Sequence, residues 1–143
     1  MGNKENIVNV SEQLIQGVRY EHLFVAGALS KRLIPEQPVV PVPWDYSVCR
    51  LDNLQNIRVQ IKGTGKMTRD KRYQITAKTG SDKTVSIDPK VVDILSCYVE
   101  DYDIWYNIPT LSLAGKSVWL YPHNRESTGQ YECWKHNWSV FKT

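Results

Sequence analysis

The chain has 143 residues, 41% of them hydrophobic, and a formal net charge of +3 at neutral pH. This length suits one hydrophobic core and is short for two, so we expect a single globular domain over 1–143. Because no apolar run approaches the roughly 20 residues of a membrane span and no signal pattern opens the chain, we expect a soluble intracellular protein with no membrane partner. The cysteines Cys49, Cys97 and Cys133 are widely spaced, which argues against a disulfide scaffold or zinc site and favours reduced thiols.

The first predicted element is a helix over residues 11–34, opened by Ser11 as N-cap and ended by Pro35. At about 100° per residue, one sector of this helix collects apolar side chains, and Glu21 lies near its centre. We expect this sector to face the core, where an unpaired carboxylate costs several kcal/mol and needs a cation or a cavity open to water. A structural salt bridge is the alternative for Glu21. The apolar residues of the sector are Leu14, Val18, Val25, Ala28 and Leu29.

An antiparallel hairpin is predicted next, after a proline-rich, edge-like stretch over 35–43. Its strands cover 45–51 and 57–64. The second strand alternates apolar and polar residues, so Ile57, Val59 and Ile61 share one face, and the polar residues between and after them share the other. Gln60 and Lys62 therefore point the same way.

The rest of the chain predicts more strands and a second helix. Two strands flank a turn at Gly80-Ser81-Asp82. Asp88-Pro89 is a typical helix start and predicts a helix through about Val99. Two aromatic and β-branched strands and a short helix that aligns two tryptophans complete the order, which indicates an α/β or α+β sandwich. These last elements cover 102–109, 116–122 and the segment from Trp134 to Trp138, and the acids Glu100, Asp101 and Asp103 before them are interpreted as surface residues.

Three polar features converge in this arrangement: Asp45 at the head of one strand, Gln60 and Lys62 on the next, and Glu21 on the helix. A carboxylate, a second oxygen ligand and a lysine on adjacent strands can hold a hard divalent cation and a water beside a phosphodiester. The lysine can orient that water and balance charge in the transition state. A solvated strand face, with Asp45 as a turn acceptor, is the simpler alternative, but it leaves Glu21 unexplained.

The segments Pro43–Val48, Val59–Thr64 and Arg19–Phe24 resemble the PD-(D/E)XK nuclease superfamily, over roughly residues 15–110. They are most similar to group I intron-encoded homing endonucleases of the cyanobacterial type, in which Gln replaces the acidic motif residue. The resemblance implies a restriction-endonuclease-like core, a mixed β-sheet flanked by helices. It also implies a bacterial, cytoplasmic and nucleoid-associated hydrolase that cuts DNA with Mg²⁺, for which Mn²⁺ can substitute.

The resemblance also assigns roles to individual residues. Asp45 is the central metal ligand, Lys62 the catalytic lysine, and Gln60 stands at the acidic ligand position. Glu21 is the helix-borne carboxylate that binds metal in some relatives, and Ile61 contributes its backbone carbonyl. Because a neutral amide attracts Mg²⁺ less than a carboxylate, Gln60 leaves the number of metal ions open, and Glu21 can restore the missing charge.

A basic segment follows the catalytic strand and is a candidate DNA contact. Some of its side chains are expected to neutralise phosphates, and Gln74 is a candidate for reading adenine in the major groove. A basic hairpin kept for solubility is the alternative. The candidate DNA-binding residues are Lys66, Arg69, Lys71, Arg72, Gln74 and Lys78.

One active site cuts one strand, so cleavage of both strands requires at least a homodimer, and the resemblance implies a tetramer built as a dimer of dimers. The aromatic segment 115–143 is a candidate oligomerisation extension, and core packing is its alternative. The leading hypothesis is a site-specific endonuclease acting on double-stranded DNA. A Holliday-junction resolvase and a non-catalytic DNA-binding module of the same fold are its rivals.

Overall fold

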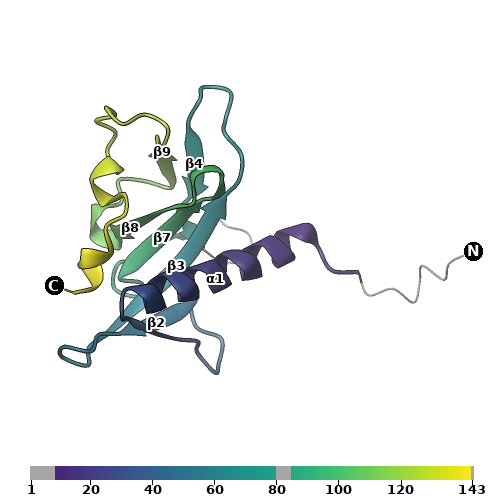
Figure 1. The fold of residues 1–143 in the computed structure, drawn as a ribbon. Helices are drawn as coiled ribbons and strands as arrows, with labels where there is room; N and C mark the ends of the chain where they lie inside the picture. Colours follow the sequence, from purple (N-terminus) through teal and green to yellow (C-terminus); the bar gives the residue numbers. More distant parts are fainter. Residues whose placement is uncertain (1–8, 80–84, 143) are drawn as a thin grey trace, which may run out of the picture.

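The computed structural model describes residues 9–79 and 85–142 (Figure 1). Its centre is a five-stranded mixed sheet with the strand order β1-β2-β3-β7-β8. β3 and β7 run parallel, and the other neighbouring pairs are antiparallel. The strands are β1 (Ile34–Glu36), β2 (Tyr46–Cys49), β3 (Asn56–Thr64), β7 (Ile94–Val99) and β8 (Ile104–Pro109).

The helix α1 (Glu12–Ser30) packs on one face of this sheet, and a two-stranded ribbon packs on the other. The ribbon pairs β4 (Tyr73–Thr76) with β9 (Ser117–Leu120). A short hairpin pairs β5 (Lys78–Thr79) with β6 (Val85–Ser86), and the predicted turn at Gly80-Ser81-Asp82 lies outside the described residues. Short 3₁₀ helices are η2 (Glu100–Tyr102), η3 (Thr110–Ser112), η4 (Glu132–Trp134) and η5 (Trp138–Phe141).

Each face of the central sheet has its own core, because side chains alternate along the strands. On the α1 side, Ile57, Val59 and Ile61 of β3 are buried, as the alternation predicted. On the ribbon side, Leu95 and Cys97 of β7 meet the ribbon. The predicted hairpin is confirmed by the antiparallel pairing of β2 with β3. Within the described part of the chain, no helix has both the length and the apolar character needed to cross a bilayer.

The prediction for the core-facing side of α1 was wrong for most of the sector. The buried residues of the helix are Tyr20, Phe24 and Ala28, four apart along one stripe. Of the predicted sector, Ala28 is buried and Val25 packs against the core, whereas Leu14, Val18 and Leu29 are exposed. Aromatic rings bury more apolar surface than aliphatic side chains, so the helix turns its aromatic stripe toward the sheet. The aliphatic sector is left largely in solvent.

The prediction of a second helix from Asp88 to about Val99 was also wrong. The start signal is real but produces a single turn, in which the Asp88 carbonyl accepts hydrogen bonds from the Val91 and Val92 amides, at 2.9 and 3.0 Å. The residues after that turn form β7, which is buried along its whole length. A strand buried on both faces reads as a continuous apolar run, and such a run cannot be distinguished from a buried helix by periodicity alone.

The C-terminal segment completes the domain. Tyr131 belongs to the core on the ribbon side, and Phe141 is fully buried on the α1 side. The predicted short helix aligning Trp134 and Trp138 is wrong, because two separate 3₁₀ turns place these rings against different cores. His136, between the turns, has a φ of 57°, a left-handed conformation that interrupts any continuous helix.

Candidate active site

The candidate site lies where β2 begins, because from there on one edge of β3 has no neighbouring strand. The last backbone contact is the Asp45 amide donating to the Val59 carbonyl at 2.9 Å. The next amide on this edge, that of Ile61, donates to Asp45 Oδ2 at 2.7 Å. Because the N–H and C=O of one strand residue point to the same side, the Ile61 carbonyl also faces this open edge. The Asp45 carboxylate thus takes the place of the carbonyl acceptor that a neighbouring strand would provide, and the Ile61 amide holds it in position.

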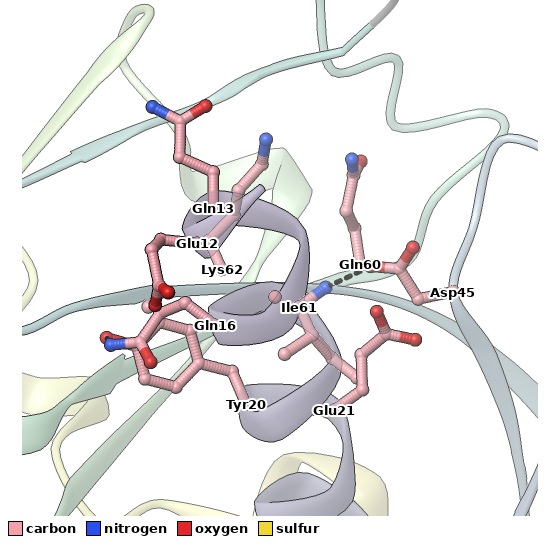
Figure 2. A pocket seen from close by; sticks show the side chains of 11 residues that line it. Glu12, Gln13, Gln16, Tyr20, Glu21, Asp45, Gln60, Ile61 and Lys62 are labelled. Carbon is pink, nitrogen blue, oxygen red and sulfur yellow. Dashed lines mark hydrogen bonds between the residues drawn. The ribbon is translucent and has the colours of Figure 1, made fainter. Parts of the chain in front are cut away.

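A cavity of about 700 Å³ lies between α1 and this part of β3 (Figure 2). The five residues predicted to form the catalytic and metal site all line it, although they come from a helix, a strand and the residue preceding another strand. They are Glu21, Asp45, Gln60, Ile61 and Lys62. The sequence analysis did not identify the other lining residues, which are Glu12, Gln13, Gln16, Gly17, Tyr20 and Gly63.

The Glu21 and Asp45 carboxylates point toward each other across the end of this cavity (Figure 2). Burial raises the pKa of Asp45, although the Ile61 amide and the charge of Lys62 partly oppose that increase. Burial also raises the pKa of Glu21, and repulsion by Asp45 raises it further. A cation between the two carboxylates would relieve both the burial cost and the repulsion.

Gln60 and Lys62 extend to the same side of β3 (Figure 2). Gln60 is only 8% exposed, and its Oε1 is a buried acceptor with no hydrogen-bond partner among the described residues. An unsatisfied buried acceptor costs about 1–3 kcal/mol, so this oxygen is suited to a ligand. Lys62 is half-buried, and its charge opposes the burial that raises the pKa of Asp45 and of Cys97.

These oxygen donors fit a hard divalent cation. The described residues contain no group of three or more His, Cys, Asp or Glu side chains that would hold a metal by themselves. Two carboxylates, the Ile61 carbonyl and the Gln60 amide oxygen are nevertheless an all-oxygen set. Mg²⁺ is commonly held by one or two carboxylates and keeps several waters, so this set suits it.

A polar cluster beside the cavity fixes the position of α1, and the sequence analysis did not detect it. The Glu100 carboxylate forms an ion pair with Arg19 and accepts hydrogen bonds from Gln16 at 2.9 Å and Tyr20 at 3.1 Å. The 16/20 spacing on one helix face was visible in the sequence, but the partner lies some 80 residues away, beyond any local pattern. Glu100 was interpreted as a surface residue. Its contacts make it an anchor for the helix that carries Glu21.

The basic segment lies between β3 and β4 and projects beyond the sheet (Figure 1). Lys66, Arg69 and Lys71 are exposed there. Arg72 instead stacks over Trp119, with its guanidinium carbon 3.5 Å from the ring centroid, and pairs with Asp70 at 2.9 Å.

The two remaining candidate DNA contacts lie on the strands that follow. Gln74 is exposed on β4 and donates to Ser117 Oγ at 3.1 Å, and Lys78 is half-buried. The exposed cations are thus free to meet phosphates, whereas Arg72 is already engaged in packing.

Comparison with known proteins places this geometry in a fold. No protein-family model matches the chain, and no curated protein matches it by sequence. Among solved structures, the chain is similar to the bacterial homing endonuclease I-Ssp6803I, with a TM-score of 0.77 and 15% identity over 92% of this chain and 93% of that one. The Holliday junction resolvase Hjc of Archaeoglobus fulgidus gives a TM-score of 0.48 at 8% identity over 76% of this chain and 85% of that one, a likeness too low to carry weight. The chain therefore has the restriction-endonuclease-like fold with a mixed sheet, as the resemblance implied. The sheet was expected to be flanked by helices, but in the described residues α1 covers one face and the β4–β9 ribbon covers the other.

Proposed function

We propose that this protein is a site-specific homing endonuclease that hydrolyses both strands of double-stranded DNA with Mg²⁺. The observation that carries the proposal is the meeting of Glu21, Asp45, Gln60 and Lys62 in one cavity at the open edge of β3. The fold shared with a bacterial homing endonuclease supports it. Neither a solvated strand face nor a simple salt bridge accounts for two acids repelling each other beside a lysine.

Glu21, Asp45 and the Ile61 carbonyl are the residues we assign to Mg²⁺, with Gln60 Oε1 as a further oxygen. Mn²⁺ would substitute, because it accepts the same carboxylate, carbonyl and water ligands. When bound, the ion supplies positive charge that polarises the phosphodiester and acidifies a water. Asp45 Oδ2 already accepts the Ile61 amide, so Oδ1 is the oxygen that remains for a ligand.

Lys62 is the residue we assign to the scissile phosphate. Its ammonium would attract a non-bridging oxygen and orient the attacking water by hydrogen bonding. As the water adds to phosphorus and the leaving oxygen departs, negative charge grows on the phosphate oxygens, and a fixed cation in a partly buried site stabilises that charge. The half-buried position of Lys62 strengthens this interaction relative to one in bulk water.

We assign the DNA phosphates beside the cut to Lys66, Arg69 and Lys71, which are exposed on the segment after β3. Gln74 is the candidate base reader, since its exposed amide can give up its hydrogen bond to Ser117 and form hydrogen bonds with adenine instead. Arg72 and Lys78 would support the shape of this region and add to its positive field. Because each cavity cuts one strand, the acting species is a homodimer or a tetramer.

The test is cleavage of a plasmid or genomic DNA library in Mg²⁺ or Mn²⁺ by wild type, Asp45→Asn and Lys62→Ala. Asn keeps an acceptor for the Ile61 amide, so it removes the charge with little change of shape. We expect cutting at one long sequence, and a loss of at least about 100-fold in rate in either variant.

Other outcomes distinguish the rivals. Cutting of four-way junctions regardless of sequence would favour a resolvase. Binding without cutting, unchanged in Asp45→Asn, would favour a non-catalytic DNA-binding module. Absence of both cutting and binding with either metal would overturn the proposal, provided that circular dichroism shows a folded protein.

A further inference from the structure

An apolar stripe runs along the outer face of α1 and is not used by the fold of the domain. We call it the outer stripe, and several of its side chains are strongly exposed: Leu14 at 61%, Ile15 at 49%, Val18 at 45% and Leu29 at 53%. His22 and the half-buried Val25 lie between them on the same face. This is largely the sector that the sequence pattern predicted to be buried, and the helix turns Tyr20, Phe24 and Ala28 to the sheet instead.

The spacing of the outer stripe is that of a helix–helix seam. Ile15, Val18, His22, Val25 and Leu29 follow one another at alternating intervals of three and four residues. That heptad spacing places about one side chain per turn along a line that a second helix can pack against. Single exposed aliphatic residues are ordinary, but a continuous seam over the length of a helix marks an interaction surface.

Among the described residues of the seam, Val25 packs against the α1-side core, whereas Ile15, Val18 and Leu29 belong to neither core and are exposed. The N-terminal half of the helix extends past the sheet (Figure 1). The cavity with Glu21 and Asp45 opens between α1 and β3, and none of the α1 residues that line it belongs to the seam. A partner on the outer stripe would therefore leave the cavity open.

Charge at the two ends of α1 indicates which partner fits. Glu12, which also lines the cavity, is exposed in the first turn, and Lys31 and Arg32 are exposed just after the last turn. If two copies of the helix pack antiparallel and cross near His22, each Glu12 lies near the basic C-terminal end of the partner's helix. The two helix dipoles then run in opposite directions, which is a favourable arrangement. A parallel pair would instead bring like charges together at both ends.

We propose that the outer stripe is a two-fold interface, in which α1 packs antiparallel against α1 of a second copy of this chain. An isologous contact of this kind needs a surface that complements itself, and a seam with opposite charges at its ends meets that condition. The proposal does not depend on nuclease activity. If the proposed function holds, the same contact joins two cavities in one particle, as cutting two strands requires.

Sedimentation equilibrium of the full chain, without metal or DNA, tests the interface. We expect a reversible dimer for wild type and a dissociation constant raised more than tenfold in Val18→Asp, since the change puts a carboxylate in the centre of the seam. Leu111→Asp is the matched control, because Leu111 is 87% exposed on η3, outside the seam, and should leave the constant unchanged. A monomeric wild type, or equal effects of the two variants, would overturn the proposal.

Cysteine cross-linking tests the direction of packing. In a background carrying Cys49→Ser and Cys133→Ser, one sample carries Ile15→Cys and another Leu29→Cys. An antiparallel pair joins Ile15→Cys to Leu29→Cys when the samples are mixed, and the mixed dimer should exceed either homodimer several-fold. Predominant homodimers would show parallel packing and overturn the antiparallel contact. Because neither measurement uses DNA, their failure is separate from failure of the proposed function.

Discussion

Glu21 and Asp45 are held in a position that opposes their ionisation. Burial dominates the raised pKa of each, and Asp45 adds repulsion at Glu21. The backbone enforces this, because the Ile61 amide holds Asp45 and α1 holds Glu21. Residues that cost stability by themselves and gain it with a ligand are typical of functional sites.

The sign of this effect gives a prediction for stability against pH. A carboxyl whose pKa is raised by folding binds its proton more tightly in the folded state, so its contribution to stability falls as pH rises. The fall begins near the ordinary pKa values of 4.5 for Glu21 and 3.8 for Asp45 and ends above the raised ones. Without metal, we expect the free energy of unfolding of wild type to decline as pH rises through this window. The decline should be smaller in the Glu21→Gln, Asp45→Asn double variant, as measured by urea unfolding in the presence of a chelator.

The same samples provide the control with metal. Adding Mg²⁺ at neutral pH should raise the free energy of unfolding of wild type, because binding to the folded state stabilises it. The double variant should show little response. A steeper decline with pH in the double variant, or an equal Mg²⁺ response in both proteins, would contradict the assignment of these two acids.

At the scale of elements, the site depends on how closely α1 approaches β3. Gly63 allows that approach, because a Cβ built there would lie 2.3 Å from the Tyr20 ring. Glu100 then fixes the same helix through Gln16, Arg19 and Tyr20. A strand glycine and a distant acid thus position Glu21 without touching a substrate.

Gly63→Ala tests this contact. The added methyl must displace the Tyr20 ring, so we expect a loss of about 1–3 kcal/mol in the free energy of unfolding, measured in urea. Gly17→Ala is the matched control, because nothing lies within 4 Å of its Cβ and alanine favours a helix, for an expected gain of about 0.5–1 kcal/mol. Equal effects at the two glycines would show that the ring does not limit the approach of α1.

At the scale of the whole molecule, one sheet separates two cores, and the C-terminal segment contributes to both. Phe141 is fully buried and packs against Phe24, with ring centroids 6.2 Å apart. The described part of the segment 115–143 therefore contributes side chains to both cores, whatever further contacts it makes. The last turn of this segment lies beside α1 on the same side of the sheet, where the Trp138 ring contacts both Phe24 and Trp105.

Phe141→Ala should cost about 3–5 kcal/mol in the free energy of unfolding, because the truncation leaves a cavity in a packed core. Chemical denaturation measures the loss, and Leu111→Ala, at an exposed position, should change it by less than about 0.5 kcal/mol. A Phe141→Ala protein with unchanged stability but altered oligomeric state would show that the segment is mainly an assembly element.

The sequence alone determined the features that depend on neighbouring residues. The β2–β3 hairpin followed from alternation at period two, the start of α1 from the Ser11 cap, and the residues of the candidate site from the polar positions of β3 read beside Asp45. A resemblance in short motifs indicated the fold. Each of these signals lies within a few residues of the structure it predicts.

Only the tertiary structure decided which side of α1 is buried and whether Asp88–Val99 is helix or strand. Both depend on partners distant in the chain: Gly63 and the sheet for Tyr20 and Phe24, and β3 for β7. Glu21 lines a cavity, as predicted, but the predicted reason was wrong. It lies at the edge of the buried stripe of α1, whereas the sequence pattern placed it at the centre of that stripe. The physical reason is that local propensity is worth tenths of a kcal/mol per residue, whereas burying an aromatic side chain is worth several times more.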